Sequence, residues 1–87
     1  MGYQIRFHED WRPCWEKLDN SVQIRISKKI KQIAEGLPGR HLELGADYFV
    51  EEVGQYRIAY TSNEAEGVRS VYFVGTHKEY MKWLRIE

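Results

Sequence analysis

Two runs of β-branched and aromatic residues in the second half of the chain constrain its fold more than any other feature. They are residues 56–60 and 68–74, and the polar segment 61–67 separates them. β-Branched and aromatic side chains favour strands, and a short polar connection that contains glycine favours a hairpin. The sequence therefore predicts an antiparallel pair of strands with Arg57 inside the first of them. A guanidinium in a sheet needs solvent, an acid or an anion as its partner.

A short polar and aromatic segment follows the second run. Gly75 ends that run, and hydroxyl-bearing or titratable side chains come directly after it, at Thr76, His77, Lys78 and Tyr80. Alternation along a strand places Arg57 on the face opposite to its two neighbours, so a helix layer on one face leaves Arg57 on the other, open face. Because the segment after Gly75 leaves the neighbouring strand, we expect these side chains to converge with Arg57 on one hollow.

Such a set of side chains suits RNA cleavage without a metal ion. In that reaction the ribose 2′-hydroxyl attacks the adjacent phosphate, so one group accepts a proton, another supplies one, and a cation stabilises the developing charge. Histidine titrates in the range needed for a base or an acid, and arginine binds phosphate through two parallel hydrogen bonds. His77 and Arg57 are therefore the candidate catalytic residues, with Tyr80 beside them.

Each of these residues also has a purely structural interpretation. Arg57 can form an ion pair across the hairpin with Glu51 or Glu52. His77 can be an ordinary residue at the start of a helix. Tyr80 and Trp83 can be packing residues. The sequence leaves both interpretations open for every one of them.

The first third of the chain predicts a strand and two helices. Residues 3–7 alternate between apolar and polar side chains, which indicates a strand with one wet side. Asp10 can cap a short helix whose core stripe holds Trp11, Trp15 and Leu18. A longer helix then follows, with Asn20 and Gln23 spaced as a capping pair. Its apolar positions recur at steps of three and four, at Val22, Ile26, Ile30, Ile33 and Leu37.

The longer helix must end near Gly36, because the following Pro-Gly pair cannot continue it. Residues 40–47 form a polar connection in which Leu42, Leu44 and Gly45 can make a short strand or bulge. Residues 48–53 then predict a strand, residues 54–55 a tight turn, and residues 78–84 a last helix. The predicted fold is α+β in the order β-α-α-β-β-β-α, with a two-helix hairpin on one face of a small, mainly antiparallel sheet and a short C-terminal helix.

Composition limits the class of protein. Eighty-seven residues, 43% of them hydrophobic, predict one packed domain, 1–87. Thirteen basic and thirteen acidic residues give a net charge of zero, which is unusual for a protein that binds nucleic acid on its own. The single cysteine, Cys14, suits a reducing compartment, and no signal or membrane-spanning segment is visible, so we expect a cytoplasmic protein. No two histidines have metal-ligand spacing, and we expect neither a metal nor a cofactor.

The order of the motifs resembles the RelE/ParE superfamily of toxins from toxin–antitoxin modules. The resemblance lies in V-G-Q-Y-R-I-A-Y, a loop, and V-Y-F-V-G-T-H-K-E-Y, and it extends to W-E-K-L-D-N-S-V-Q-I-R-I-S-K-K-I-K-Q-I near the start. It implies that Arg57 falls on the family's strand arginine and His77 on the basic position after the V-G step. It also implies RNA contacts from Lys78, Arg40, Lys28 and Lys31, although lysines on a helix are typical of any solvated face.

Two classes of function are consistent with the resemblance. The first is a ribosome-dependent, metal-independent mRNA endonuclease that inhibits translation and is held inactive by a cognate antitoxin. The second is a ParE-like gyrase inhibitor or a non-catalytic, partner-binding member of the same superfamily. The histidine at position 77 favours the first class. Zero net charge and the acids Glu51 and Glu52, where ribosome-dependent members often carry lysines, favour the second.

Overall fold

A five-stranded sheet forms the centre of the fold. The computed structural model describes residues 2–36, 40–41 and 48–86. The strands lie in the order β1-β5-β4-β3-β2, with β1 parallel to β5 and the other neighbours antiparallel. The elements are β1 (Gln4–Phe7), α1 (Trp11–Glu16), α2 (Asn20–Ala34), β2 (Arg40–His41), β3 (Phe49–Val53), β4 (Tyr56–Asn63), β5 (Val68–Thr76) and α3 (His77–Ile86). This arrangement confirms the predicted α+β fold with its mainly antiparallel sheet.

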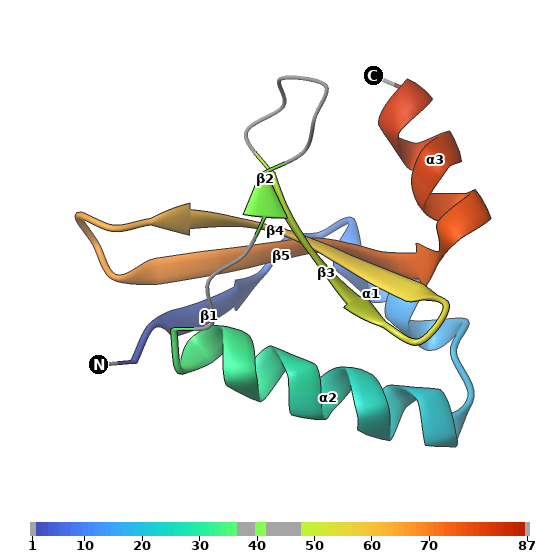
Figure 1. The fold of residues 1–87 in the computed structure, drawn as a ribbon, viewed down its shortest axis with the longest axis horizontal. Coiled ribbons are helices and arrows are strands. Elements are labelled where there is room, and N and C mark those ends of the chain that lie inside the picture. Colours follow the sequence, from blue (N-terminus) through green and yellow to red (C-terminus); the bar gives the residue numbers. More distant parts are fainter. Residues whose placement is uncertain (1, 37–39, 42–47, 87) are drawn as a thin grey trace.

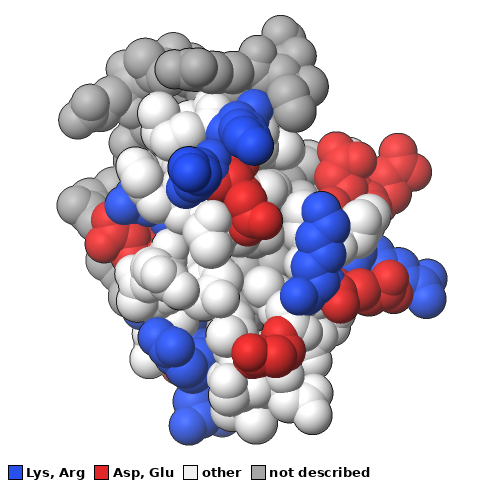
Figure 2. Space-filling view, turned by 90° about the vertical axis from the view of Figure 1, so that its right-hand side faces the viewer, with Lys and Arg blue, Asp and Glu red and all other residues white. Residues whose placement is uncertain are grey.

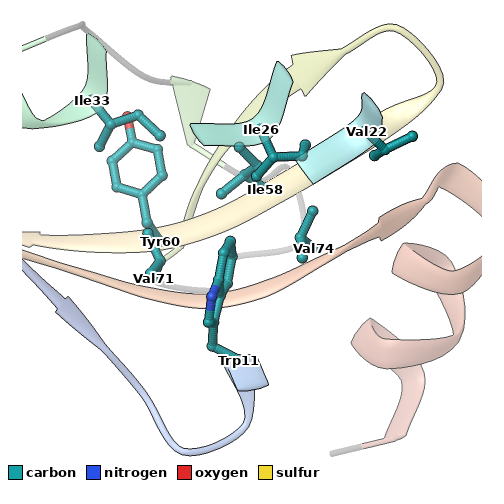
Figure 3. Close-up of a cluster of buried hydrophobic side chains, with 8 residues drawn as sticks. All are labelled: Trp11, Val22, Ile26, Ile33, Ile58, Tyr60, Val71 and Val74. Atoms are coloured by element: carbon teal, nitrogen blue, oxygen red, sulfur yellow. The ribbon is translucent and has the colours of Figure 1, made fainter. Parts of the chain in front are cut away.

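The main core lies between α2 and the sheet (Figure 1). Figure 3 shows Ile26 and Ile33 of α2 directed at Ile58 and Tyr60 of β4, and all four are fully buried. Burying one such aliphatic side chain stabilises the fold by about 1.5–3 kcal/mol, so this layer carries much of the stability. The other buried members are Trp11, Val22, Val71 and Val74, and the rest of the predicted stripe, Trp15 and Leu18, packs half-buried against them.

The opposite face of the sheet is partly covered by α3. We call it the α3 face and define it by Arg57, Ala59 and Phe73, which alternate with the core residues of β4 and β5. Figure 1 shows α3 on the other side of the sheet from α2, and Tyr80 of α3 packs with Ala59 and Phe73 in a second buried cluster. The expectation of an open second face was therefore wrong at this end, because the aromatic side of α3 buries itself there.

Several element boundaries differ from those predicted. Asp19, and not Asn20, caps α2, because its Oδ1 accepts a hydrogen bond from the Val22 backbone N–H at 3.0 Å. Asp10 precedes α1 but makes no side-chain capping bond. The β4–β5 hairpin is longer than expected, since β4 continues to Asn63.

A short strand, β2, lies at Arg40–His41, directly before the residues Leu42, Leu44 and Gly45 where a short strand or bulge was predicted. Leu42, Leu44 and Gly45 lie outside the described residues, as does Leu37 of the predicted helix stripe.

A reciprocal pair of hydrogen bonds starts α3. Glu79 Oε1 accepts from the Thr76 backbone N–H at 2.9 Å, and Thr76 Oγ1 accepts from the Glu79 backbone N–H at 3.3 Å. This is a capping box, and it fixes the first helical residue at His77. Gly75 allows the turn because a Cβ there would lie 2.8 Å from both Phe73 Cζ and Glu79 Oε1.

Replacing Gly75 by alanine should therefore destabilise the junction between β5 and α3. The Phe73 ring is stacked on Trp83 and has little room to move, so Gly75→Ala should lower the free energy of unfolding by about 1–3 kcal/mol, as overpacking does. Gly2→Ala is a matched control, because a Cβ there meets only a carbonyl oxygen at 3.6 Å. Urea denaturation of both variants measures the difference, and equal stabilities would contradict the crowding at Gly75.

Candidate functional site

Arg57 lies on the α3 face, with acidic and glycine neighbours across the sheet. It pairs with Glu52 of β3 and Gly75 of β5. Its Nη1 lies 3.2 Å from Glu52 Oε2, and its side chain is 26% exposed. Glu51 pairs with Ile58 and so lies on the other face. Of the two predicted ion-pair partners the structure selects Glu52, and Arg57 stays partly accessible to an anion from solvent.

His77 and Lys78 lie at the same end of the sheet as Arg57. The His77 backbone N–H donates to the Gln55 carbonyl oxygen at 3.1 Å, which continues the β4–β5 pairing beyond Thr76. His77 therefore follows Gly75, the cross-strand partner of Arg57, by two positions. Both His77 and Lys78 are exposed in the first turn of α3. The structure thus places Arg57, His77 and Lys78 at the same end of the sheet.

Tyr80 lies beneath this junction and is only 4% exposed. Its ring centroid is 5.9 Å from Arg57 Cζ, and the ring also contacts Phe73 and Trp83. Burial raises the pKa of the Tyr80 hydroxyl, and the positive charge of Arg57 opposes part of that rise. The hydroxyl is buried without a hydrogen-bond partner among the described residues. Tyr80 is therefore both a packing residue and a protonated hydrogen-bond donor beside Arg57.

The other basic residues expected to bind RNA are not gathered at this junction. Lys28 and Lys31 are exposed on α2, which covers the opposite face of the sheet (Figure 1). Arg40 belongs to the edge strand β2, which β3 separates from β4. The side chain of Arg40 is outside the described part of the structure. Of the four residues expected to bind RNA, Lys78 lies at the same end of the sheet as Arg57 and His77.

A groove of about 770 Å³ opens beside the end of β5, between α1 and α3. β1 pairs with residues 68–71 of β5, and no strand of the described residues pairs with the rest of that edge, which leaves room for the groove. Its walls are both apolar and charged, and they include Cys14, Lys17, Leu18, Glu79, Lys82 and Trp83. Figure 2 shows the end of the molecule that carries α3 and the β3–β4 turn, where positive and negative side chains lie side by side around uncharged surface.

Other chemistry-bearing features are sparse in the described residues. Within residues 2–36, 40–41 and 48–86, no three His, Cys, Asp or Glu side chains gather so that they could hold a metal ion. No helix in the same residues is long and apolar enough to cross a lipid bilayer. Cys14 is a free, half-buried thiol whose Sγ lies 3.5 Å from the Asp10 carbonyl oxygen.

A second arginine in the hairpin, Arg69, has a structural role. It is 4% exposed and lies on the α2 face of the sheet. It donates to the Ile33 carbonyl oxygen at 3.1 Å and to Ser62 Oγ at 3.0 Å, and its Cζ lies 4.1 Å from the Tyr3 ring centroid. Arg69 therefore ties the end of α2 to β1 and to the hairpin, where a substrate cannot reach it.

Sequence reasoning missed two features of the α3 face. The first is the Thr76–Glu79 capping box, which the spacing T-x-x-E could have revealed. The second is His8, whose ring stacks on Tyr72 at 4.4 Å between centroids. Alternation from Gln4 and Arg6 could have placed His8 on this face, but no local signal pairs it with a residue so distant in sequence.

Comparison with solved structures identifies the fold. A substituted variant of the Escherichia coli toxin RelE in the free state matches with a TM-score of 0.75 at 24% identity, over 100% of both chains. The toxin–antitoxin complex RelBE2 from Mycobacterium tuberculosis matches with a TM-score of 0.74 at 21% identity, over 88% of this chain and 100% of that chain. The intact E. coli RelBE toxin–antitoxin complex matches with a TM-score of 0.75 at 24% identity, over 85% of this chain and 95% of that chain.

Similarity in sequence is confined to a shorter stretch. A putative RelE-like toxin protein from Escherichia coli is 40% identical over 35 residues, which are 40% of this chain and 37% of that protein. The match thus spans less than half of that relative, and no protein-family model matches the chain. The resemblance seen in the strand motifs is confirmed at the level of architecture, and the chain has the fold of the RelE toxins.

Proposed function

We propose that this protein is the toxin of a toxin–antitoxin module and that it cleaves mRNA on the ribosome, in the cytoplasm. The observation that carries the proposal is the junction of β4, β5 and α3. There Arg57 Cζ lies 5.9 Å from the ring of Tyr80, whose buried hydroxyl has no hydrogen-bond partner among the described residues. The exposed His77 pairs with Gln55, two positions before Arg57. The solved structures of the same fold include RelE toxins and their complexes with antitoxins, which supports the same role for this single domain of residues 1–87.

The proposed chemistry is transfer of the phosphate to the neighbouring 2′-oxygen. The 2′-oxygen forms a bond to phosphorus, the bond from phosphorus to the 5′-oxygen breaks, and a cyclic phosphate and a 5′-hydroxyl result. His77 takes the proton of the 2′-hydroxyl, because imidazole accepts protons at neutral pH. Arg57, with Lys78 near it, stabilises the charge on the phosphorane oxygens. Tyr80 is the proposed donor of the proton to the departing 5′-oxygen, and this donation requires that its buried hydroxyl become exposed.

Dependence on the ribosome follows from charge. A protein with thirteen basic and thirteen acidic residues gains little from phosphate contacts alone. Arg57, His77 and Lys78 lie at the same end of the sheet, and Glu52 offsets part of the charge of Arg57. A ribosome that holds both the message and the toxin supplies the proximity that electrostatic attraction does not.

Arg57→Ala should lower cleavage by roughly a hundredfold to a thousandfold, as loss of a charge-stabilising donor does. His77→Ala should lower it by about a hundredfold to ten-thousandfold and flatten one limb of the pH profile, as loss of an acid or base does. Primer extension on a message in a translation extract measures both effects. Arg12→Ala is a matched control, because Arg12 is 83% exposed on α1 and pairs only with Glu16 among the ion pairs described. Unchanged cleavage in both site variants would remove this junction as the active site.

The Glu52–Arg57 ion pair favours a second candidate, a ParE-like gyrase inhibitor or a non-catalytic binding member. A carboxylate 3.2 Å from the guanidinium occupies a position that a phosphate would need. If the ion pair is only structural, then Arg57 serves to hold β3 on β4 and the face binds a protein surface. The two functions differ in what the removal of Glu52 should do.

Glu52→Gln should raise cleavage by up to about fivefold if the proposed function holds, because an exposed ion pair is worth up to about 1 kcal/mol and its loss frees Arg57 for phosphate. Glu16→Gln, which removes the acid of a more exposed ion pair on α1, should leave cleavage unchanged. Melting temperature is measured beside cleavage and growth arrest. A common loss of melting temperature in Glu52→Gln and Arg57→Ala, with growth arrest intact, would favour the binding protein.

An antitoxin partner is the remaining part of the proposal. The groove between α1 and α3 combines apolar walls with charges of both signs, and an amphipathic helix has matching chemistry. Coexpression with the product of an adjacent small open reading frame should yield a complex that co-purifies and abolishes growth arrest. Recovery of a free, stable monomer that never affects growth would contradict the module.

A further inference from the structure

The α3 face carries a continuous chain of ring contacts. Its members contact one another in sequence, with centroid separations of 4.4 Å for His8–Tyr72, 5.3 Å for Tyr72–Tyr48, 5.0 Å for Tyr48–Trp83, 5.1 Å for Trp83–Phe73 and 6.2 Å for Phe73–Tyr80. Tyr80 contacts Arg57, so the chain joins His8 at the end of β1 to the proposed cleavage site. We call it the ring track. Phe73 and Tyr80 are buried. The other rings of the track, those of His8, Tyr72, Tyr48 and Trp83, are half-buried and keep part of their surface in solvent.

His8 is the end of the ring track that is farthest from Arg57. Its side chain is 38% exposed, and its ring lies at 28° to the Tyr72 ring. Its backbone N–H donates to the Val71 carbonyl oxygen at 3.0 Å, and its Nδ1 accepts from the Asp10 backbone N–H at 3.1 Å. The Asp10 carboxylate Oδ2 lies 3.5 Å from the same Nδ1. The ring is thus held in place, and it presents a fixed aromatic surface that costs little side-chain entropy to use.

A polar hollow of about 470 Å³ lies against Tyr72. Arg6, Ser70 and Thr61 line it, and the sheet register places them side by side on β1, β5 and β4. Glu64 and Glu66 also line it, and Glu64 already accepts hydrogen bonds from Tyr3 and Ser62. A phosphate would avoid these carboxylates and lie toward Arg6, whereas a base or ribose hydroxyl could use the hydroxyl groups.

We propose that His8 stacked on Tyr72, with Arg6 beside them, forms a second nucleotide subsite for single-stranded RNA. The subsite rests on the proposed function, because it would hold a nucleotide that flanks the one cleaved at Arg57. Ser70 and Gly75, the β5 partners of Arg6 and Arg57, are five residues apart, or roughly 16 Å along the strand. The flanking nucleotide would therefore not be the immediate neighbour of the cleaved phosphate, and the half-buried rings of Tyr72, Tyr48 and Trp83 would lie under the bases between them.

RNA fits this surface better than a protein helix does. Every base has a flat face that stacks on aromatic rings without regard to sequence, and each phosphate needs a cation. The track supplies rings with Arg6 at one end and Arg57 at the other. A docking helix would bury an apolar stripe, whereas the hollow beside Tyr72 is lined by hydroxyls, carboxylates and Arg6.

His8→Ala tests the subsite, with His8→Phe as the matched control that keeps an aromatic ring. Loss of a base–aromatic stack should raise the toxin concentration for half-maximal cleavage on programmed ribosomes by roughly 5- to 150-fold, with the maximal rate unchanged. His8→Phe should stay near the wild type. Arg57→Ala should show the opposite pattern, a lower maximal rate. Melting temperatures of the variants show whether each one is folded at the assay temperature.

Other outcomes overturn the subsite. If His8→Ala cleaves like the wild type, or if it weakens only the antitoxin complex, then the surface does not bind RNA in this way. If the wild type cleaves nothing, the proposed function fails, and the subsite is tested by binding of a labelled single-stranded RNA oligonucleotide at low salt. Binding that His8→Ala weakens and His8→Phe keeps would support the subsite alone. Absence of binding by the wild type would overturn it as well.

Discussion

The antiparallel pairing of β4 with β5 is the constraint on which the rest of the molecule depends. Its register sets Arg57 opposite Gly75 and Ile58 opposite Val74. Because side chains alternate across a strand, this one register sends Ile58 and Val74 into the core beneath α2 and keeps Arg57 on the α3 face. A slip of one residue would bury the guanidinium among aliphatic side chains, and the cost of that burial makes the register unambiguous.

The site is built where this pairing ends. A glycine opposite Arg57 leaves room for the Phe73 ring and for Glu79, so α3 can start immediately after the strand and turn across the sheet. The helix then brings Tyr80 against Arg57 and Trp83 against Phe73. The same small residue thus serves the fold and the site, because any larger side chain would push α3 away from the arginine it covers.

The sequence was sufficient for the elements that depend on periodicity. The alternation in β4 and β5 and the three- and four-residue steps of α2 predicted which face each residue takes, and the buried Ile26, Ile33 and Ile58 agree with that. It was insufficient where tertiary contacts decide. Asp19 and Asn20 are both good caps, and the structure selects Asp19, whose backbone is extended and whose side chain accepts from the Val22 backbone N–H. The contact between His8 and Tyr72 arises from the parallel pairing of β1 with β5, and no local sequence pattern predicts that pairing.

The two arginines of the hairpin show why a residue type alone does not identify a site. Arg69 is enclosed by a carbonyl oxygen, a hydroxyl and two tyrosine rings, and these partners satisfy a cation that cannot exchange them for a substrate. Arg57 is paired with a carboxylate that is 47% exposed, and such a partner is held weakly because water screens it. In the proposed function, a phosphate would therefore replace Glu52 at a small cost in free energy, whereas exchanging the buried partners of Arg69 would break its bond to the Ile33 carbonyl oxygen of α2. The face of the sheet and the exchangeability of the partner, rather than the charge itself, distinguish the candidate catalytic arginine from the structural one.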